Sequence, residues 1–162
     1  MEYTGYMAVS KKYYLTKEGL KGIEKEYKKL LKLRRLKSKE GVPSVLHSEE
    51  LNAEFIAFRE DVDLLESKIE ELDHILKNFE LIKPPSRTER DKIHLGAHVK
   101  VEVGGQMDEF IIVGTLEANP SLGKISNESP VGKALLSHKV GEEVIVSSPT
   151  KTTYKIKKIK YK

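Results

Sequence analysis

A regular spacing of apolar residues runs through the middle of the chain. Between positions 51 and 79 they recur at alternating steps of four and three: Leu51, Phe55, Phe58, Val62, Leu65, Ile69, Leu72, Leu76 and Phe79. This heptad spacing is typical of a coiled-coil helix with a narrow apolar stripe. A helix over 49–80 would be about 45 Å long, because an α-helix rises about 1.5 Å per residue.

An earlier segment supplies a partner for this helix. Its apolar residues also follow helical steps: Leu20, Ile23, Tyr27 and Leu30. Thr16 is a suitable N-cap, and Gly41 and Pro43 interrupt the pattern before the second helix begins. The spacing predicts an antiparallel hairpin over 1–82, with its distal tip at about residues 39–50.

Charge favours pairing of the two helices within one chain. Residues 17–39 carry ten basic side chains and three glutamates, whereas residues 49–80 carry eleven acidic side chains and three basic ones. An exposed ion pair contributes only about 0–1 kcal/mol, so these charges select the partner more than they stabilise it. A coiled coil between two chains remains the alternative.

The pattern changes to alternation after Pro84-Pro85, which cannot continue a helix. Apolar residues alternate with polar ones in "HVKVEV", 98–103, and Gly104-Gly105 is suited to a hairpin turn. Ser129 and Pro130 predict the N-cap and first residue of a short helix. A second domain is therefore expected over 83–162, with a boundary near 83–90.

The last predicted strand changes the parity of its apolar residues. Tyr154 and Ile156 share one parity, and Ile159 and Tyr161 share the other. A β-bulge near Lys157-Lys158 would bring all four to one face. The fold class predicted for the whole chain is α+β, with a helical hairpin followed by a small antiparallel sheet and one helix.

Composition narrows the class of protein. The chain has 162 residues, 33% of them charged, and no cysteine, which excludes a disulfide framework and a thiolate zinc site. No apolar run suits a signal peptide or a membrane span, so a soluble cytoplasmic protein is expected. Residues 83–162 hold 14 basic and 9 acidic side chains. Their lysine-rich end, "KIKKIKYK", could contact nucleic acid, although the solvated face of an edge strand is the commoner meaning.

Candidate chemistry is concentrated at the predicted hairpin tip. His94 and His98 are interrupted by Gly96 and are expected to be surface or structural residues. Glu49 and Glu50 follow Ser48, where they could simply favour the start of a helix by about 0.3–1 kcal/mol each. Alternatively, two carboxylates at the end of a rigid rod could help to hold Mg²⁺ and activate water inside another enzyme.

One long stretch resembles a known family. "GKISNESPVGKALLSHKVGEEVIV", Gly123 to Val146, is similar to the C-terminal signature of the Gre transcript cleavage and elongation factors of bacterial RNA polymerase. "VGTLEANP", "YKIKKIKY" and "YLTKEGLKGIEKEYKKL" fit the same pattern. The resemblance covers about residues 11–162, with a gap near the tip.

The resemblance implies how such a protein works. The hairpin would enter the secondary channel of RNA polymerase, and an FKBP-like C-terminal domain would dock at the channel rim through Glu128, Ser129 and Pro130, exposed on a rigid corner. Acidic tip residues, Glu49 and Glu50, would help to bind the polymerase's Mg²⁺. The chain would be a monomeric accessory factor rather than an enzyme, would bind no cofactor alone, and would meet nascent RNA and DNA only within the elongation complex.

The tip departs from the family's pattern, G-D-L-S-E-N-A-E-Y. Aligning its end with "NAEF", 52–55, places the family's acids on Ser48 and Leu51. Either Glu49 or Glu50 replaces them, or the protein occupies the channel as an inhibitor or regulator without cleavage. A nucleic-acid-binding module that acts away from polymerase is a third interpretation, based on the basic C-terminal half.

Overall fold

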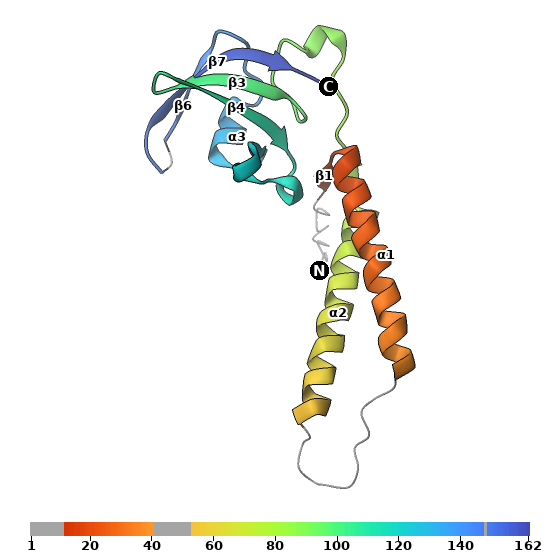
Figure 1. Cartoon of the computed structure of the whole chain (residues 1–162). Coiled ribbons are helices and arrows are strands. Elements are labelled where there is room, and N and C mark those ends of the chain that lie inside the picture. The colour runs from red at the N-terminus through yellow and green to blue at the C-terminus, as the bar shows by residue number, and fades with distance from the viewer. Residues whose placement is uncertain (1–11, 41–52, 148) are drawn as a thin grey trace, which may run out of the picture. The chain divides into compact units, whose positions relative to one another are not determined.

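The computed structural model describes residues 12–40, 53–147 and 149–162 (Figure 1). They divide into two compact units: Leu20–Asn78 form one, and the residues on either side of that range form the other. Among the described residues, no helix is both long enough and apolar enough to cross a bilayer. The division into folding domains at 82/83 stays a prediction.

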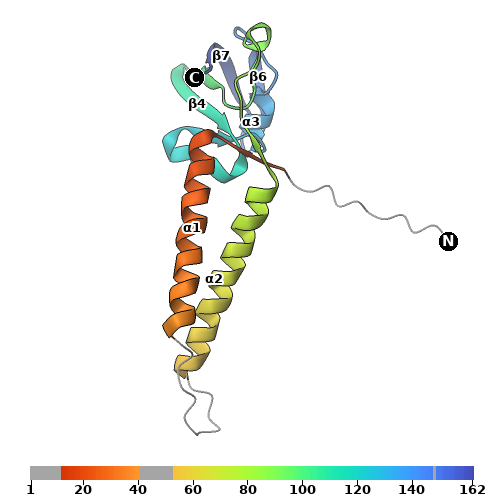
Figure 2. The same cartoon turned by 90° about the vertical axis from the view of Figure 1, so that its right-hand side faces the viewer.

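The first unit is a hairpin of two helices, α1 (Lys17–Glu40) and α2 (Ala53–Lys77), which lie side by side in Figures 1 and 2. Arg34 pairs with Glu66 at 3.3 Å, and Lys37 pairs with Asp61 at 2.9 Å. The residue with the higher number on α1 pairs with the residue with the lower number on α2, so the helices are antiparallel. The predicted intrachain hairpin between a basic and an acidic arm is confirmed.

The predicted apolar seam is buried in its middle part. Leu65, Ile69 and Leu72 are buried as expected, while Ile75 rather than Leu76 provides the next buried position. The predicted extension of the helix to residue 80 is wrong, and Phe79 lies in strand β2 (Phe79–Leu81). The Asn78 side chain donates to the His74 carbonyl at 2.8 Å and so satisfies a carbonyl at the helix end. Leu51 and the predicted helix start lie outside the described residues.

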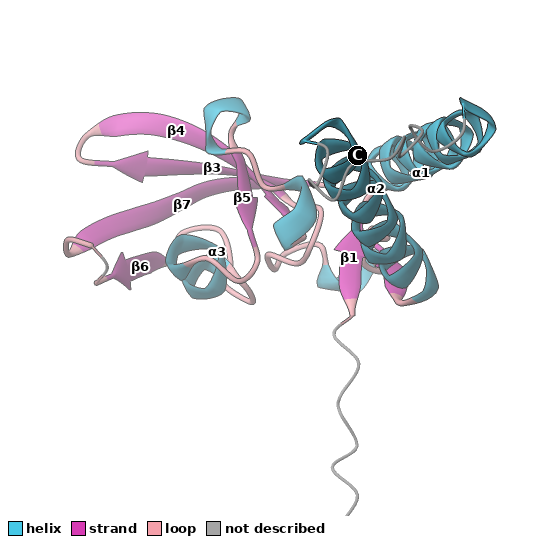
Figure 3. Ribbon diagram, turned by 90° about the horizontal axis from the view of Figure 1, so that it is seen from below, coloured by secondary structure: helices cyan, strands magenta, loops and turns pink. Residues whose placement is uncertain are grey.

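The second unit contains a five-stranded sheet in the order β5-β4-β3-β7-β6, with helix α3 against one face (Figure 3). The elements are β3 (His98–Val103), β4 (Gln106–Val113), β5 (Lys124–Ser126), α3 (Pro130–Leu135), β6 (Glu143–Val146) and β7 (Thr152–Lys160). Neighbouring strands are antiparallel except for β4 and β5, which are parallel. The predicted α+β fold class is therefore confirmed, with one parallel pair in this sheet that the pattern did not predict.

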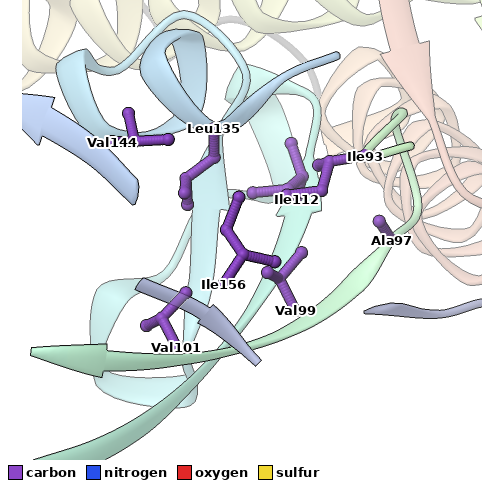
Figure 4. Packing of buried hydrophobic residues seen from close by; sticks show 8 residues of the cluster. All are labelled: Ile93, Ala97, Val99, Val101, Ile112, Leu135, Val144 and Ile156. Atoms are coloured by element: carbon purple, nitrogen blue, oxygen red, sulfur yellow. The ribbon is translucent and has the colours of Figure 1, made fainter. Parts of the chain in front are cut away.

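The core of this unit lies between the sheet and α3. Val99 and Val101 on β3 and Ile156 on β7 are fully buried and face Leu135 of α3 (Figure 4). The β3–β4 turn needs two residues with positive φ, and Gly104 and Gly105 have φ values of 57° and 80°. Glycine adopts this conformation without a steric penalty, which explains the tight hairpin.

A β-bulge in β7 corrects the parity of its side chains. Lys100 of β3 is opposite Lys158, but the next residue, Val101, is opposite Ile156. Lys157 is therefore the extra residue, and the predicted bulge is confirmed. The lysine-rich end of β7 lies at an edge of the sheet, as expected. Residues 152–155 pair with β6, but residues 156–160 have β3 as their single partner strand.

Two short parallel strands, β1 (Tyr13–Leu15) and β2, flank the hairpin in the sequence and belong to the second unit. Leu15 is fully buried. Thr16 then caps α1, as predicted, because its hydroxyl accepts from the Gly19 amide at 3.0 Å. The Thr16 amide and hydroxyl both donate to the Glu117 carboxylate, a partner about which the local sequence carries no signal.

Candidate functional site

The corner between β5 and α3 is held by a compact set of hydrogen bonds. The Ser126 carbonyl accepts from the Ser129 hydroxyl at 2.7 Å and from the Ser129 amide at 3.1 Å. The Ser129 hydroxyl in turn accepts from the Gly132 amide at 3.0 Å. Ser129 is therefore the N-cap of α3, as the Ser-Pro pair predicted.

Gly132 allows the first turn of α3 to lie directly against β5. A Cβ atom at this position would be 2.0 Å from the Ser126 carbonyl oxygen, well inside van der Waals contact. Since that oxygen belongs to the backbone, a larger residue would have to displace either the strand or the helix. The corner from Ser126 to Gly132 is consequently a rigid feature of the surface.

The three residues predicted to be exposed on this corner differ in exposure. Glu128 and Pro130 are exposed, whereas Ser129 is half-buried because its hydroxyl serves the turn and the helix cap. The expectation that all three are exposed is thus wrong for Ser129. Glu128 and Pro130 offer an acidic and an apolar group side by side, while Ser129 holds the backbone that presents them.

A second element, the 3₁₀ turn η2 (Thr115–Glu117), completes the corner. The Thr115 hydroxyl donates to the Glu128 carboxylate at 3.1 Å and lies 3.1 Å from the Ser126 hydroxyl. Tyr14 and Leu116 join Glu128 around a hollow of about 50 Å³. Leu116 is 44% exposed. These neighbours left no signal in the sequence, because only the fold brings them to residue 128.

The predicted tip carboxylates, Glu49 and Glu50, lie outside the described residues, as do Ser48 and Leu51. Helix α2 is described from Ala53 onward. Across the described ranges 12–40, 53–147 and 149–162, histidine and carboxylate side chains nowhere gather in groups of three or more that could hold a metal. The tip assignment therefore rests on the sequence.

The two histidines considered as ligands occupy different surroundings. His94 precedes β3, and its backbone amide donates to the Tyr161 hydroxyl at 2.9 Å. Its ring Nε2 is buried and has no hydrogen-bond partner within the described residues. His98 begins β3, where burial is the main cause that lowers its pKa and the nearby Lys162 lowers it further. These positions are consistent with structural roles.

Comparison with known proteins covers both units. The family described as "Transcription elongation factor, N-terminal" matches residues 13–81, and "Transcription elongation factor, GreA/GreB, C-term" matches residues 87–161. The chain is 38% identical over 140 residues to transcription elongation factor GreA of Thermomicrobium roseum, covering 85% of this chain and 90% of the relative. It is also 38% identical over 160 residues to GreA of Clostridium acetobutylicum, covering 95% and 100% of the two chains.

Among solved structures, the crystal structure of GreA factor homolog 1 (Gfh1) of Thermus thermophilus is 25% identical. The match covers 93% of this chain and 99% of that one, with a TM-score of 0.40.

Proposed function

Since the chain belongs to the GreA/GreB family of transcription elongation factors, we propose that it binds bacterial RNA polymerase and stimulates the polymerase's own cleavage of backtracked RNA. The hairpin enters the secondary channel, and the second unit docks at the channel rim. The observation that carries this proposal is the corner from Ser126 to Gly132, because hydrogen bonds around Ser129 preorganise the backbone that presents the exposed Glu128 and Pro130. The chain acts as an accessory factor, and the catalytic centre is the polymerase's.

Glu49 and Glu50 are the residues proposed to reach that centre. Carboxylate oxygens are the protein ligands that Mg²⁺ prefers, so this pair has the appropriate donor chemistry. Mg²⁺ held there would activate a water for phosphodiester hydrolysis. The chain's own part is to place one or both carboxylates beside the weakly bound ion of the polymerase. The glutamates also follow Ser48 at a helix start, so a structural contribution accompanies the chemical one.

A backtracked elongation complex with labelled RNA tests this role. The wild-type chain should shorten the RNA, and Glu49→Gln with Glu50→Gln should abolish shortening while polymerase binding is retained. Glu60→Gln with Glu70→Gln is a matched control, since it removes the same charge from exposed positions of α2. The control should cleave at the wild-type rate. Equal cleavage by wild type and the tip variant would exclude a chemical role for the pair.

A second function is favoured by one specific observation: Ser48 and Leu51 stand where the family's acidic residues align. A protein that occupies the channel without supplying a metal ligand would slow nucleotide addition and leave the RNA length unchanged. The same elongation complex therefore distinguishes a cleavage factor from a channel-binding regulator. Neither outcome requires the chain to bind nucleic acid outside the complex.

A further inference from the structure

The sheet face turned away from α3 is rich in lysine. On β3, Val99 and Val101 point toward the core, so His98, Lys100 and Glu102 point to the opposite face. The partners of His98 and Lys100 on β7 are Lys160 and Lys158. We call Lys158, Lys160 and Lys162, together with His98 and Lys100 opposite them, the lysine face.

Ion pairs neutralise several lysines of this sheet, but the lysines at the end of β7 have no such partners among the described residues. Carboxylates lie within ion-pair distance of three of them: Lys155 with Glu143, Lys157 with Glu102 and Lys100 with Glu109, at 3.2, 2.5 and 3.3 Å. In the part of the chain that the structure describes, Lys158, Lys160 and Lys162 have no such partner. Positive charge therefore accumulates at one end of the face.

Basic side chains also face each other across the strands. Lys158 is opposite Lys100, and Lys160 is opposite His98. Such pairs destabilise a sheet when both members are charged. The low pKa of His98 reflects its burial first and then the positive charge of Lys162 and Lys160. Because Lys100 pairs with Glu109 and the lowered pKa of His98 favours its neutral form, the free positive charge at this end belongs to Lys158, Lys160 and Lys162.

A groove of about 420 Å³ adjoins the lysine face. Leu95, Ile111 and Tyr161 contribute apolar lining, while His98, Lys124 and Lys162 contribute basic groups. Among the described residues, Lys17 and a single acidic residue, Glu18, also line the groove. Its volume lies within the range of about 300–1,000 Å³ that is usual for small-molecule sites. An apolar floor beside cations suits an unpaired base joined to phosphates, and such a base is available in a single strand but not in a duplex.

We propose that the lysine face binds single-stranded RNA, with phosphates along β7 and an unpaired base in the adjoining groove. Every second residue of a strand lies on the same face, at a spacing of roughly 6–7 Å. The lysines therefore form a regular row of positive charges, which suits a polymer with one phosphate per nucleotide. The choice of RNA rests on the proposed function, because the elongation complex that this chain would join holds a backtracked RNA strand.

Fluorescence anisotropy with the full chain and a labelled single-stranded RNA tests the assignment. Lys158→Ala with Lys160→Ala should weaken binding and reduce the slope of log affinity against log salt by about 1.4, since each lost phosphate contact changes it by about 0.7. Lys133→Ala with Lys151→Ala removes the same charge from exposed positions outside the face. This control should bind like wild type, and circular dichroism should show that both variants are folded.

Equal losses in the two variants, or no binding by the wild type at low salt, would overturn the lysine face as an RNA site. Competition by poly-glutamate as strong as that of RNA of equal charge would also overturn it, as would equal binding of a fully paired RNA. Polymerase is absent from this measurement. If the chain fails to bind RNA but stimulates transcript cleavage normally, only this inference is therefore overturned. If it binds RNA but does not bind polymerase, only the proposed function is overturned.

Discussion

At the scale of single residues, Tyr161 joins the end of the chain to the segment before β3. Its hydroxyl donates to the Lys92 carbonyl and accepts from the His94 amide. Burial is the main cause that raises its pKa above the ordinary value. The neutral phenol is therefore the form that the folded protein favours, and both hydrogen bonds depend on the hydroxyl group.

Tyr161→Phe should lower the free energy of unfolding by about 0.5–1.5 kcal/mol for each hydrogen bond lost. Because the folded pKa is raised, the contribution of Tyr161 is present below the unfolded pKa of about 10 and is lost as pH rises through the folded value. Urea unfolding of both proteins at pH 8 and at pH 11 should show a smaller difference at the higher pH. An unchanged difference would mean that the phenol does not titrate as argued.

Local motifs correctly predicted the roles of two residues. The contacts that were not predicted join residues that are far apart in the sequence. Thr16 and Ser129 were identified as helix caps because each cap bonds to an amide three residues away. The carboxylate of Glu117 that binds Thr16, and the Thr115 hydroxyl that binds Glu128, come from other elements. Such partners become neighbours only through the fold, so a single sequence gives no pattern for them.

At the scale of elements, adjacent leucines of α2 provide an internal comparison. Leu65 is 7% exposed in the hairpin seam, whereas Leu64 is 72% exposed. Leu65→Ala should cost toward the lower end of about 2–5 kcal/mol, since a two-helix seam encloses a side chain less than a globular core does. Leu64→Ala should change stability by less than about 0.5 kcal/mol. Thermal unfolding would contradict the assigned seam if both variants lost the same stability.

Periodicity predicted the long elements but not the three-residue strands. A heptad seam and an alternating strand each repeat often enough to be recognised, and even the bulge in β7 left a change of parity between Ile156 and Ile159. Strands β1, β2 and β5 have three residues each. Three residues cannot establish a period, and the parallel pairings of these strands depend on segments distant in the sequence.

At the scale of the whole molecule, the exposed corner is expected to control assembly with RNA polymerase. Glu128→Arg with Pro130→Ala should weaken polymerase binding in a pull-down, because it reverses a charge and removes an apolar ring without touching the Ser129 cap. Glu89→Arg with Pro84→Ala makes the same chemical changes at other exposed positions. Binding by this control should equal that of wild type. Equal binding by the corner variant, with normal circular dichroism, would assign docking to another surface.

The bulge at Lys157 predicts where β7 tolerates the deletion of a single codon. Without Lys157 the strand would read Tyr-Lys-Ile-Lys-Ile-Lys-Tyr from position 154, an uninterrupted alternation that keeps every core side chain on its face. Loss of that codon should give a folded protein that lacks only the exposed ion pair with Glu102, worth about 0–1 kcal/mol. Loss of the codon for Lys155, two residues earlier, places Tyr154 next to Ile156 and should yield insoluble protein. Soluble expression of both deletants measures this asymmetry. β7 can lose one lysine codon, 157 or the identical 158, at the place where the pairing with β3 shifts.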